Sequence, residues 1–143
     1  MSSRKTVVVG IDGSANSHKA LTWAATEAAD HGAELIVVNV WEHTLLPPAG
    51  TPSVSERYAP FPSERTTEDL VNEVKEVLGA EPPVLVQPHV RQGNPAQVLI
   101  EQSADADLLV VGTRGHGGFR GLVLGSVSQH VAGYAKCPVV VVR

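Results

Sequence analysis

The chain has 143 residues, a length that fits one domain large enough to bury a core of its own. Hydrophobic residues make up 43% of it and charged residues 18%, proportions typical of a soluble globular protein. The net charge of −4 argues against nonspecific nucleic-acid binding, which requires a basic surface. No apolar stretch is long enough for a signal peptide or a membrane span, so we expect no membrane partner.

The single cysteine, Cys137, excludes an intrachain disulfide and fits a reducing, cytoplasmic location. It precedes Pro138 at the start of an apolar run, so we interpret it as a small buried hydrophobic residue. A redox role is the less favoured interpretation.

The first part of the chain predicts two strands joined by a helix. Residues 6–11 are a β-branched run typical of a strand buried on both faces. A turn at 12–14 follows, and small apolar residues then recur at helical spacing, with Asn16 or Ser17 as the expected helix cap. Residues 34–41 predict the second strand, which makes the unit a right-handed parallel crossover.

Residues 43–66 differ in character, with five of the ten prolines placed among Ser, Thr and Gly. This composition predicts a long flexible connection, either a mobile lid or a disordered excursion. Thr66 and Asp69 have the spacing of a capping box, and apolar residues at helical spacing follow until Gly79. We therefore expect a helix directly after the connection.

The second half of the chain continues the alternation of strands and helices. A strand over 84–90 contains Pro88, which cannot donate to a ladder, so we expect this strand at a sheet edge. The remaining elements are expected as a short helix opened by Asn94 and Pro95, a strand over 107–111, a helix over about 126–135 and a strand over 139–142. The pattern is that of an α/β sandwich with a parallel sheet.

The valine run at 139–142 has little chain after it to cover it. An exposed strand of this kind pairs with another chain or aggregates. The alternative is a strand buried beneath the helices that carry Ala20 and Val131. We favour pairing, and hence a homodimer through residues 139–142.

The most distinctive segment runs from Gly112 to Ser126 and holds six of the 13 glycines. Glycines let backbone amides approach an anion, and a helix start adds unpaired donors and a positive dipole. Residues 108–143 contain no Asp or Glu and carry +4, so residues 1–107 carry the −8 that makes the net charge −4. The segment predicts a site for a small anionic ligand, with a plain surface loop as the alternative.

Two common phosphate-binding motifs are absent from this segment. A P-loop has Lys directly before its Ser or Thr, and no Lys precedes Ser126. The dinucleotide fingerprint needs a glycine three residues after Gly117, where Arg120 stands. The segment therefore suits phosphate physically but belongs to neither class.

A third pattern is complete. Gly112, Gly115, Gly125 and Ser126 have the spacing Gly-x2-Gly-x9-Gly-Ser, in which the chain resembles nucleotide-binding members of the universal stress protein family. The resemblance extends to the opening Val-Val-Val-Gly-Ile-Asp-Gly-Ser, the lead-in Asp105-Ala106-Asp107 and the ending Cys137-Pro138-Val139. It covers nearly the whole chain apart from the proline-rich connection.

The resemblance implies one domain over residues 1–143, with the flexible connection at 43–66 inside it. The implied fold is an α/β three-layer sandwich of the adenine nucleotide alpha hydrolase-like type, with four helices and a five-stranded parallel sheet in the order 3-2-1-4-5. In that order strands 1 and 4 meet at the topological switch point, where ligands bind beyond the strand ends. The proline-bearing strand and the valine strand become the two edges, and family members commonly dimerise through the last strand.

The resemblance also implies which residues bind the nucleotide: Gly10, Asp12, Gly13, Ser14, Val40, Gly112, Thr113, Arg114, Gly115, His116, Gly117, Gly118, Gly125, Ser126, Val127 and Ser128. Backbone amides of residues 115–118 and 126–127 are expected to cradle the phosphates. The Ser126 and Ser128 hydroxyls would add direct donors. Arg114 either neutralises phosphate charge or is a solvated loop arginine.

Asp12 is expected to accept from a ribose hydroxyl or to help hold Mg²⁺, and capping the following helix is its competing role. Val40 is expected to offer its backbone N–H and C=O to the adenine edge. Gly93 would allow close approach of the adenosine. Of the histidines, we interpret His116 as a backbone contributor and His130 as structural.

The implied function is that of an ATP-binding stress-response protein, with ADP or AMP as alternative ligands and Mg²⁺ as the accompanying ion. Rapid hydrolysis would need a phosphate-bridging lysine and an acid close to the glycine-rich segment, and the sequence has neither. Asp105 and Asp107 precede their strand and are expected at its far end. We therefore expect at most slow hydrolysis.

Two alternatives belong to other functional classes. One is a nucleotide-free dimeric interaction scaffold in the stress response. The other is an enzyme that uses an adenylate, which is disfavoured because no His-x-Gly-His or Lys-Met-Ser-Lys-Ser motif is present.

Overall fold

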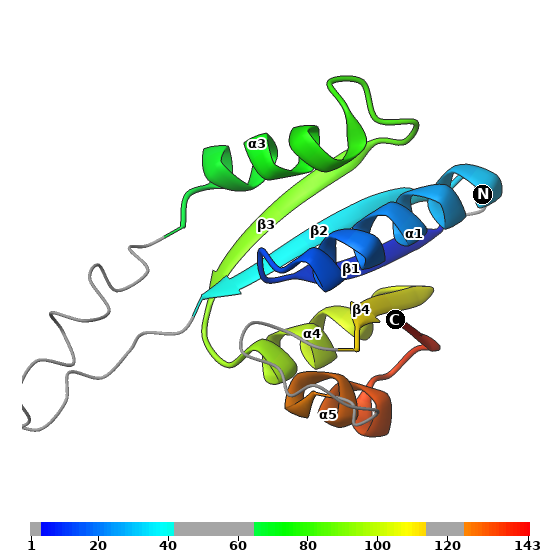
Figure 1. The fold of residues 1–143 in the computed structure, drawn as a ribbon. Coiled ribbons are helices and arrows are strands. Elements are labelled where there is room, and N and C mark those ends of the chain that lie inside the picture. The colour runs from blue at the N-terminus through cyan, green and yellow to red at the C-terminus, as the bar shows by residue number, and fades with distance from the viewer. Residues whose placement is uncertain (1–3, 42–64, 114–124) are drawn as a thin grey trace, which may run out of the picture.

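Five parallel strands form one sheet through the centre of the molecule (Figure 1). The computed structural model describes residues 4–41, 65–113 and 125–143. The strands are β1 (Thr6–Ile11), β2 (Glu34–Trp41), β3 (Val86–Gln92), β4 (Leu108–Gly112) and β5 (Val139–Val142). Their order, β3-β2-β1-β4-β5, confirms the predicted arrangement and places β3 and β5 at the edges.

Four helices in the described residues cover the two faces of the sheet. They are α1 (Ala15–His31), α3 (Thr67–Leu78), α4 (Pro95–Ser103) and α5 (Ser126–Tyr134). Figure 1 shows α1 and α3 on one side of the sheet and α4 and α5 on the other, in agreement with two separate core clusters. The predicted three-layer α/β sandwich is confirmed. Within the connection predicted at 43–66, residues 43–64 lie outside the described residues.

Successive valines of β1 face opposite layers, which explains why the strands are unbroken apolar runs. Val7 and Val9 pack into the core beneath α1 and α3, whereas Val8 packs into the core beneath α4 and α5. Val8 and Val9 expose 1% and 0% of their surfaces. Both faces of β1 are therefore buried, as predicted, and each buried valine gains about 1.5–3 kcal/mol of transfer free energy.

Helix α1 begins earlier than predicted, with Ser14 as its N-cap. The backbone at Ser14 is still extended (φ −75°, ψ 158°), and its Oγ accepts from the Ser17 N–H at 3.1 Å. The prediction of Asn16 or Ser17 as the cap is wrong because both already lie in the first helical turn. Ser17 is the donor of the capping bond rather than its acceptor.

The predicted starts of α3 and α4 are confirmed. Thr66 and Asp69 form a capping box, in which the Asp69 N–H donates to Thr66 Oγ1 at 3.1 Å and the Thr66 N–H to Asp69 Oδ2 at 3.0 Å. Asn94 caps α4 by accepting from the Gln97 N–H at 3.0 Å, with Pro95 in the first turn. Each start depends on neighbours in sequence, which is why the sequence predicts it.

Strand β3 covers Val86–Gln92 rather than the predicted 84–90. The Leu35 N–H donates to the Leu85 carbonyl at 2.9 Å, so alternate residues from Leu85 onward direct their backbone groups toward β2. Pro88 belongs to the other alternate set, whose backbone groups are directed away from β2 and out of the sheet edge. Its missing N–H therefore costs no bond to β2, which is consistent with the predicted edge position.

Candidate functional site

The carboxyl ends of β1 and β4 lie side by side where the chain changes from one face of the sheet to the other. The two strands pair in parallel, from Val7 with Leu108 to Val9 with Val110. The chain continues from β1 into α1 on one face and from β4 toward α5 on the other (Figure 1). This is the topological switch point, where open α/β sheets bind ligands.

The Asp12 carboxylate organises the turn after β1. Its Oδ1 accepts from the Ser14 N–H at 2.9 Å and from the Ser14 hydroxyl at 2.6 Å. Ser17 Oγ accepts from the Asp12 N–H at 3.3 Å and donates to the Ser14 carbonyl at 2.9 Å. Gly13 has a φ of 87°, a conformation that favours glycine. Asp12 thus orients the serine that caps α1 and is not itself the cap; its contact with a ribose stays a prediction.

The two ends of the glycine-rich segment meet at the end of β4. The Gly125 N–H donates to the Thr113 carbonyl at 2.7 Å, and the Thr113 N–H donates to the Val142 carbonyl at 2.9 Å. Residues 114–124 therefore leave and rejoin the described structure at one place. The predicted phosphate ligands Arg114, Gly115, His116, Gly117 and Gly118 lie outside the described residues.

Helix α5 begins at this same place, with Gly125 as its N-cap. No side chain caps it within the part of the chain that the structure describes. The first amides of a helix lack partners inside the helix and carry the positive end of its dipole. Ser126 is exposed and Val127 is partly buried against the core beneath α4 and α5. The predicted donors Ser126 and Val127 thus belong to the first turn of this helix.

Ser128 differs from Ser126 in its surroundings. It exposes 4% of its surface, and its hydroxyl donates to the Gly112 carbonyl. A serine hydroxyl has one hydrogen, so this bond occupies the donor that the predicted phosphate contact would use. In this arrangement Ser128 connects α5 to the end of β4.

The backbone of Val40 is directed toward β1. The Glu34 N–H donates at 3.0 Å to the carbonyl of Lys5, on the β1 side, whereas the Trp41 carbonyl accepts from the Gly93 N–H at 3.0 Å, on the β3 side. Successive residues of a strand direct their backbone groups to opposite sides, so the backbone groups of Val40, like those of Glu34, are directed toward β1. The ladder between β1 and β2 ends at the pair before Val40. Its carbonyl is therefore directed past the paired part of β1, and its contact with adenine stays a prediction.

Two glycines near the site have local structural reasons. A Cβ at Gly10 would lie 2.8 Å from Leu99 Cδ1, so α4 can pack closely against β1 because residue 10 has no side chain. Gly93, directly after β3, has a φ of 144°, which would strain any other residue. Their contacts with a nucleotide stay predictions.

Two asparagines shape the candidate site, and neither is predicted from the sequence as a site residue. Asn39 exposes 4% of its surface, and its Nδ2 donates to the Ile11 carbonyl at 3.0 Å, at the end of β1. Asn16 Nδ2 donates to the Val142 carbonyl at 3.3 Å, and its Oδ1 accepts from the Thr113 hydroxyl at 3.3 Å. An amide inside an apolar strand is a usable signal for Asn39. The partners of Asn16 are distant in sequence, so no local pattern indicates its role.

The acids Asp105 and Asp107 lie at the opposite end of the sheet. Asp107 Oδ2 accepts from the Thr6 N–H at 2.8 Å, at the amino end of β1. Their predicted distance from the glycine-rich segment is therefore confirmed. Within residues 4–41, 65–113 and 125–143, no three His, Cys, Asp or Glu side chains are grouped as a metal site.

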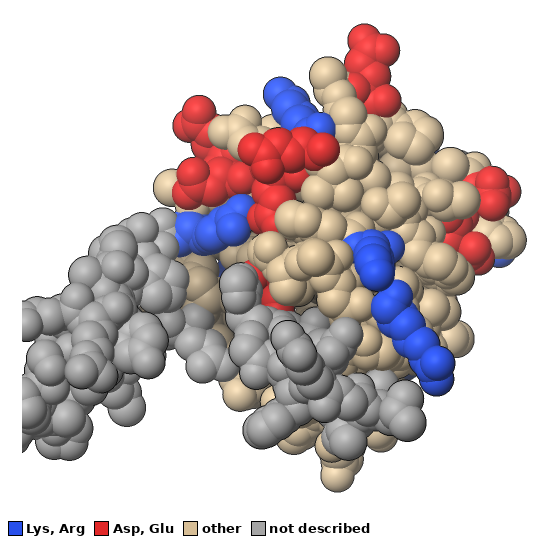
Figure 2. Space-filling model, in the orientation of Figure 1, with Lys and Arg blue, Asp and Glu red and all other residues tan. Residues whose placement is uncertain are grey.

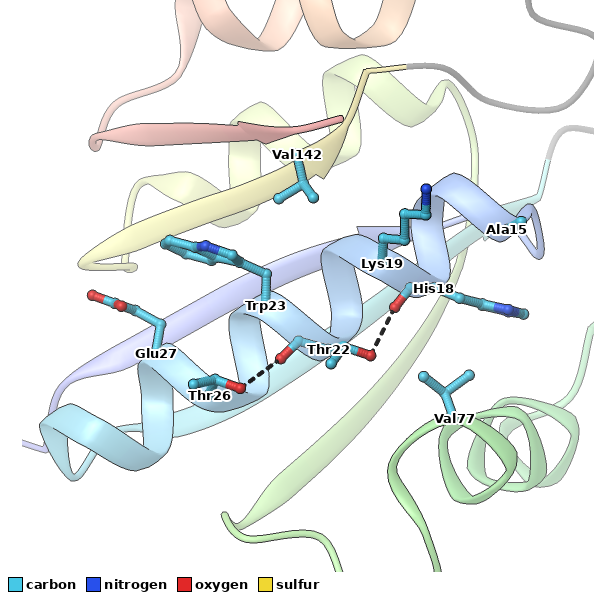
Figure 3. Close-up of a pocket in the computed structure, with 9 residues that line it drawn as sticks. All are labelled: Ala15, His18, Lys19, Thr22, Trp23, Thr26, Glu27, Val77 and Val142. Atoms are coloured by element: carbon cyan, nitrogen blue, oxygen red, sulfur yellow. Dashed lines mark hydrogen bonds between the residues drawn. The ribbon is translucent and has the colours of Figure 1, made fainter.

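A surface groove of about 540 Å³ follows the outer side of α1 and does not coincide with the switch point (Figure 3). It is lined by α1 between Ala15 and Glu27, by Val77 of α3 and by Val142 of β5. The Thr22 and Thr26 hydroxyls each donate at 3.1 Å to a carbonyl one turn earlier in α1. Their hydrogens are thus already used, so we place the candidate site at the ends of β1 and β4.

No helix among the described residues is both long and apolar enough to cross a membrane.

The sequence profile described as the universal stress protein family matches residues 3–143. The chain belongs to this family. A universal stress protein of Mycolicibacterium smegmatis is 40% identical to it over 145 aligned residues, which cover 99% of this chain and 46% of that protein. A universal stress protein of Mycobacterium tuberculosis is 33% identical, over 96% of this chain and 47% of its own length. This universal stress protein domain thus spans about half the length of these curated relatives.

A solved universal stress protein structure, UspA from Lactobacillus plantarum, shares the fold of this domain. Its TM-score is 0.75 at 23% identity, and the match covers 99% of this chain and 100% of that chain. A universal stress protein solved in complex with cAMP has a TM-score of 0.69 at 29% identity, covering 99% of this chain and 98% of that chain.

Proposed function

We propose that this universal stress protein domain binds ATP and acts as a nucleotide-dependent regulator in the stress response. The observation that carries the proposal is the complete Gly-x2-Gly-x9-Gly-Ser spacing at the switch point. Gly112 ends β4, Gly125 and Ser126 begin α5, and a hydrogen bond from Gly125 to Thr113 joins these two places. Glycine-rich backbone at a helix start is a general arrangement for holding phosphate.

The relative solved with cAMP supports an adenine nucleotide as the ligand class. In the proposed complex, Val40 contacts the adenine edge and Asp12 accepts from a ribose hydroxyl. The amides of residues 115–118 and of the first turn of α5 hold the phosphates, with Arg114 beside them. ADP and AMP are the alternative ligands. The Asp12 carboxylate suits Mg²⁺, which takes one or two carboxylates together with phosphate oxygens.

The proposed role is binding, with at most slow hydrolysis. The glycine-rich segment has no P-loop lysine, and Asp105 and Asp107 lie at the other end of the sheet. Bound nucleotide would act as a signal by changing the dimer or a surface that a partner reads. The main rival is a nucleotide-free scaffold, which would use the same fold with an empty site.

We further propose a cytoplasmic homodimer that pairs through the outer edge of β5. The Pro138 and Val142 carbonyls both accept backbone N–H groups at 2.9 Å on the β4 side. Because backbone groups alternate, Val139 and Val141 direct theirs outward. An outward row of N–H and C=O groups is a template for a second strand.

Titration calorimetry with Mg-ATP tests the binding function. We expect wild-type protein to bind one nucleotide per chain, Gly115→Val to lose binding, and Ser126→Ala to weaken it by roughly tenfold through loss of one charge-assisted hydrogen bond. Thr67→Ala, an exposed change on α3, is the control and should bind as wild type does. A wild-type protein that binds neither Mg-ATP, AMP nor cAMP would support the empty scaffold instead.

A further inference from the structure

Gly112, the first glycine of the Gly-x2-Gly-x9-Gly-Ser spacing, lies against the first turn of α1. A Cβ at this position would be 2.5 Å from Asn16 Oδ1, 3.0 Å from Asn16 Cγ and 3.2 Å from the Asn16 carbonyl oxygen. Gly112 is otherwise a regular strand residue, paired with Val142 of β5. The neighbouring asparagine, and not an unusual backbone conformation, is therefore what excludes a side chain here.

The space left by Gly112 lets the Asn16 amide connect three elements. From α1, its Nδ2 donates to the Val142 carbonyl of β5, and its Oδ1 accepts from the hydroxyl of Thr113, directly after β4; both distances are 3.3 Å. The Val142 carbonyl fixes this orientation of the amide, because a carbonyl only accepts and must therefore face the NH2 group. The Thr113 hydroxyl can donate or accept, and in this orientation it gives its hydrogen to Oδ1.

Thr113 is the last described residue before the glycine-rich segment, and all of its polar groups are bonded. Its N–H donates to Val142, its carbonyl accepts from Gly125, and its hydroxyl donates to Asn16. The first two bonds belong to the backbone of the sheet and of the returning chain. The third is the bond that a side chain contributes, and it orients Thr113 relative to the turn that holds Asp12.

We propose, on the basis of the nucleotide-binding function proposed above, that Gly112 serves Asn16 rather than the ligand, and that Asn16 is a positioning residue for the nucleotide site. It acts through Thr113, by fixing where the glycine-rich segment leaves the sheet relative to the Asp12 turn. A site whose two halves are held in register before the ligand arrives loses less conformational freedom on binding. The shared Val142 carbonyl also connects this position to the last residue of the edge strand.

A double-mutant cycle tests this assignment. Gly112→Ala places a methyl against Asn16 and should lower the unfolding midpoint and weaken Mg-ATP binding by at least about tenfold, whereas Asn16→Ala alone should weaken binding by about two- to fivefold. Asn16→Ala removes the two closest atoms that the new methyl meets and leaves the carbonyl at 3.2 Å. The double variant should therefore recover most of the midpoint and affinity that Gly112→Ala loses, and come close to Asn16→Ala alone.

Gly10→Ala is the matched control, because its methyl would meet Leu99 and not Asn16. Asn16→Ala should leave the defects of Gly10→Ala unchanged. If Asn16→Ala restores neither the stability nor the affinity of Gly112→Ala, the assignment is wrong. If stability returns but affinity does not, residue 112 meets the ligand directly and the positioning role is overturned.

Failure of the proposed function gives a different result. Wild-type protein that binds no nucleotide overturns that function and, with it, any role of Asn16 in nucleotide binding. The unfolding midpoints of wild type and of the three variants of the cycle still decide, without any ligand, whether Asn16 is the reason that residue 112 is glycine.

Discussion

His89 lies on β3, where it pairs with Val38 across the ladder to β2. Its Nδ1 is buried and has no hydrogen-bond partner among the described residues. Burial, and to a lesser degree the positive charge of Arg91, lowers the pKa of His89 below its usual 6.5, while Glu34 acts in the opposite direction. The folded protein therefore favours the neutral imidazole more strongly than the unfolded chain does.

This lowered pKa predicts a pH dependence of stability. Well above pH 6.5 His89 is neutral in both the folded and the unfolded state, so its ionisation does not change the free energy of unfolding there. As the pH falls below 6.5 the unfolded chain takes up a proton first, so the free energy of unfolding falls until the pH has passed the folded pKa. In urea unfolding measured between pH 7.5 and 5, the free energy of unfolding should fall less in His89→Gln than in wild type.

The exposed His130 provides the control for this measurement. In the variant His130→Gln, the free energy of unfolding should fall between pH 7.5 and 5 by as much as it does in wild type. Equal pH profiles for wild type and His89→Gln would show that the buried imidazole is not its source.

Three serines at the site share a side chain but not a role. The sequence predicts nucleotide contacts for Ser14, Ser126 and Ser128 alike. In the structure Ser14 caps α1, Ser128 is buried with its hydroxyl on Gly112, and Ser126 is exposed. Residue type and spacing place these serines near the candidate site, but the hydrogen-bond partner of each serine depends on its surroundings in the packed structure.

The sequence predicts Cys137 to be a small buried hydrophobic residue, and the structure places it partly buried against the core beneath α4 and α5. Its Sγ donates to the Pro138 carbonyl at 3.4 Å. Burial, followed by the negative charge of Asp107, raises the pKa of the thiol above 9.0. The thiol thus stays protonated at neutral pH, which fits a packing role better than a redox one.

At the scale of elements, the features that the sequence predicts are those set by neighbours along the chain. The capping box of Thr66 and Asp69, the Asn94-Pro95 start and the valine run of β1 are of this kind. The cap of α1 is local as well, since Ser14 bonds to Asp12 and Ser17, so the wrong cap assignment is an error about neighbouring residues. The position of β3 is instead set by a distant partner, through the bond from the Leu35 N–H to the Leu85 carbonyl. Single-sequence patterns carry little information about such partners.

A contact between α1 and α3 illustrates what local patterns miss. Glu73, 8% exposed, lies between His18 Nε2 at 2.6 Å and an Arg65 guanidinium nitrogen at 2.5 Å. A buried carboxylate is stable only when such partners compensate its desolvation. Arg65 directly precedes the α3 cap and His18 lies in the second turn of α1, so this cluster ties the chain after the proline-rich connection to the helix that starts at the site.

The outer edge of β5 carries the prediction about assembly. Val141→Pro removes an N–H that is directed outward and leaves the bonds of Val140 and Val142 toward β4 in place. We expect it to weaken the dimer by at least about tenfold, since a proline blocks strand addition at an edge. Sedimentation equilibrium of wild type and variant measures the effect.

Val141→Ala is the matched control for this experiment, because it shortens the side chain and keeps the N–H. It should weaken the dimer less than Val141→Pro does. A wild type that stays monomeric at high micromolar concentration, or two variants with the same dimer affinity, would rule out pairing through this edge.

At the scale of the whole molecule, charge is unevenly distributed. Figure 2 shows acidic side chains gathered over α3, which carries Glu68, Asp69, Glu73 and Glu76 against one lysine. The chain from residue 108 to its last residue has no acid and a charge of +4. The elements β4 and α5, which flank the glycine-rich segment in the sequence, and the last strand β5 therefore lack the negative charge that would repel an anionic ligand.

The position of the topological switch point is a whole-molecule property that the sequence predicts well. The strand order of the resembling family puts the ends of β1 and β4 together, and the observed order agrees. The details within the site, such as the Asn16 amide between β4 and β5, emerge only from the packed structure. The topology thus locates the candidate site, and tertiary contacts decide which side chains lie at it.

The most direct test of the proposed function is the nucleotide content of freshly purified protein. Acid release and chromatography would be applied to wild type and to a Gly115→Val/Ser126→Ala variant, with Mg-ATP titrated into any empty protein. We predict close to one adenine nucleotide per wild-type chain, and little in the variant. A wild type that is purified empty and fails to bind added Mg-ATP would contradict the nucleotide-binding function.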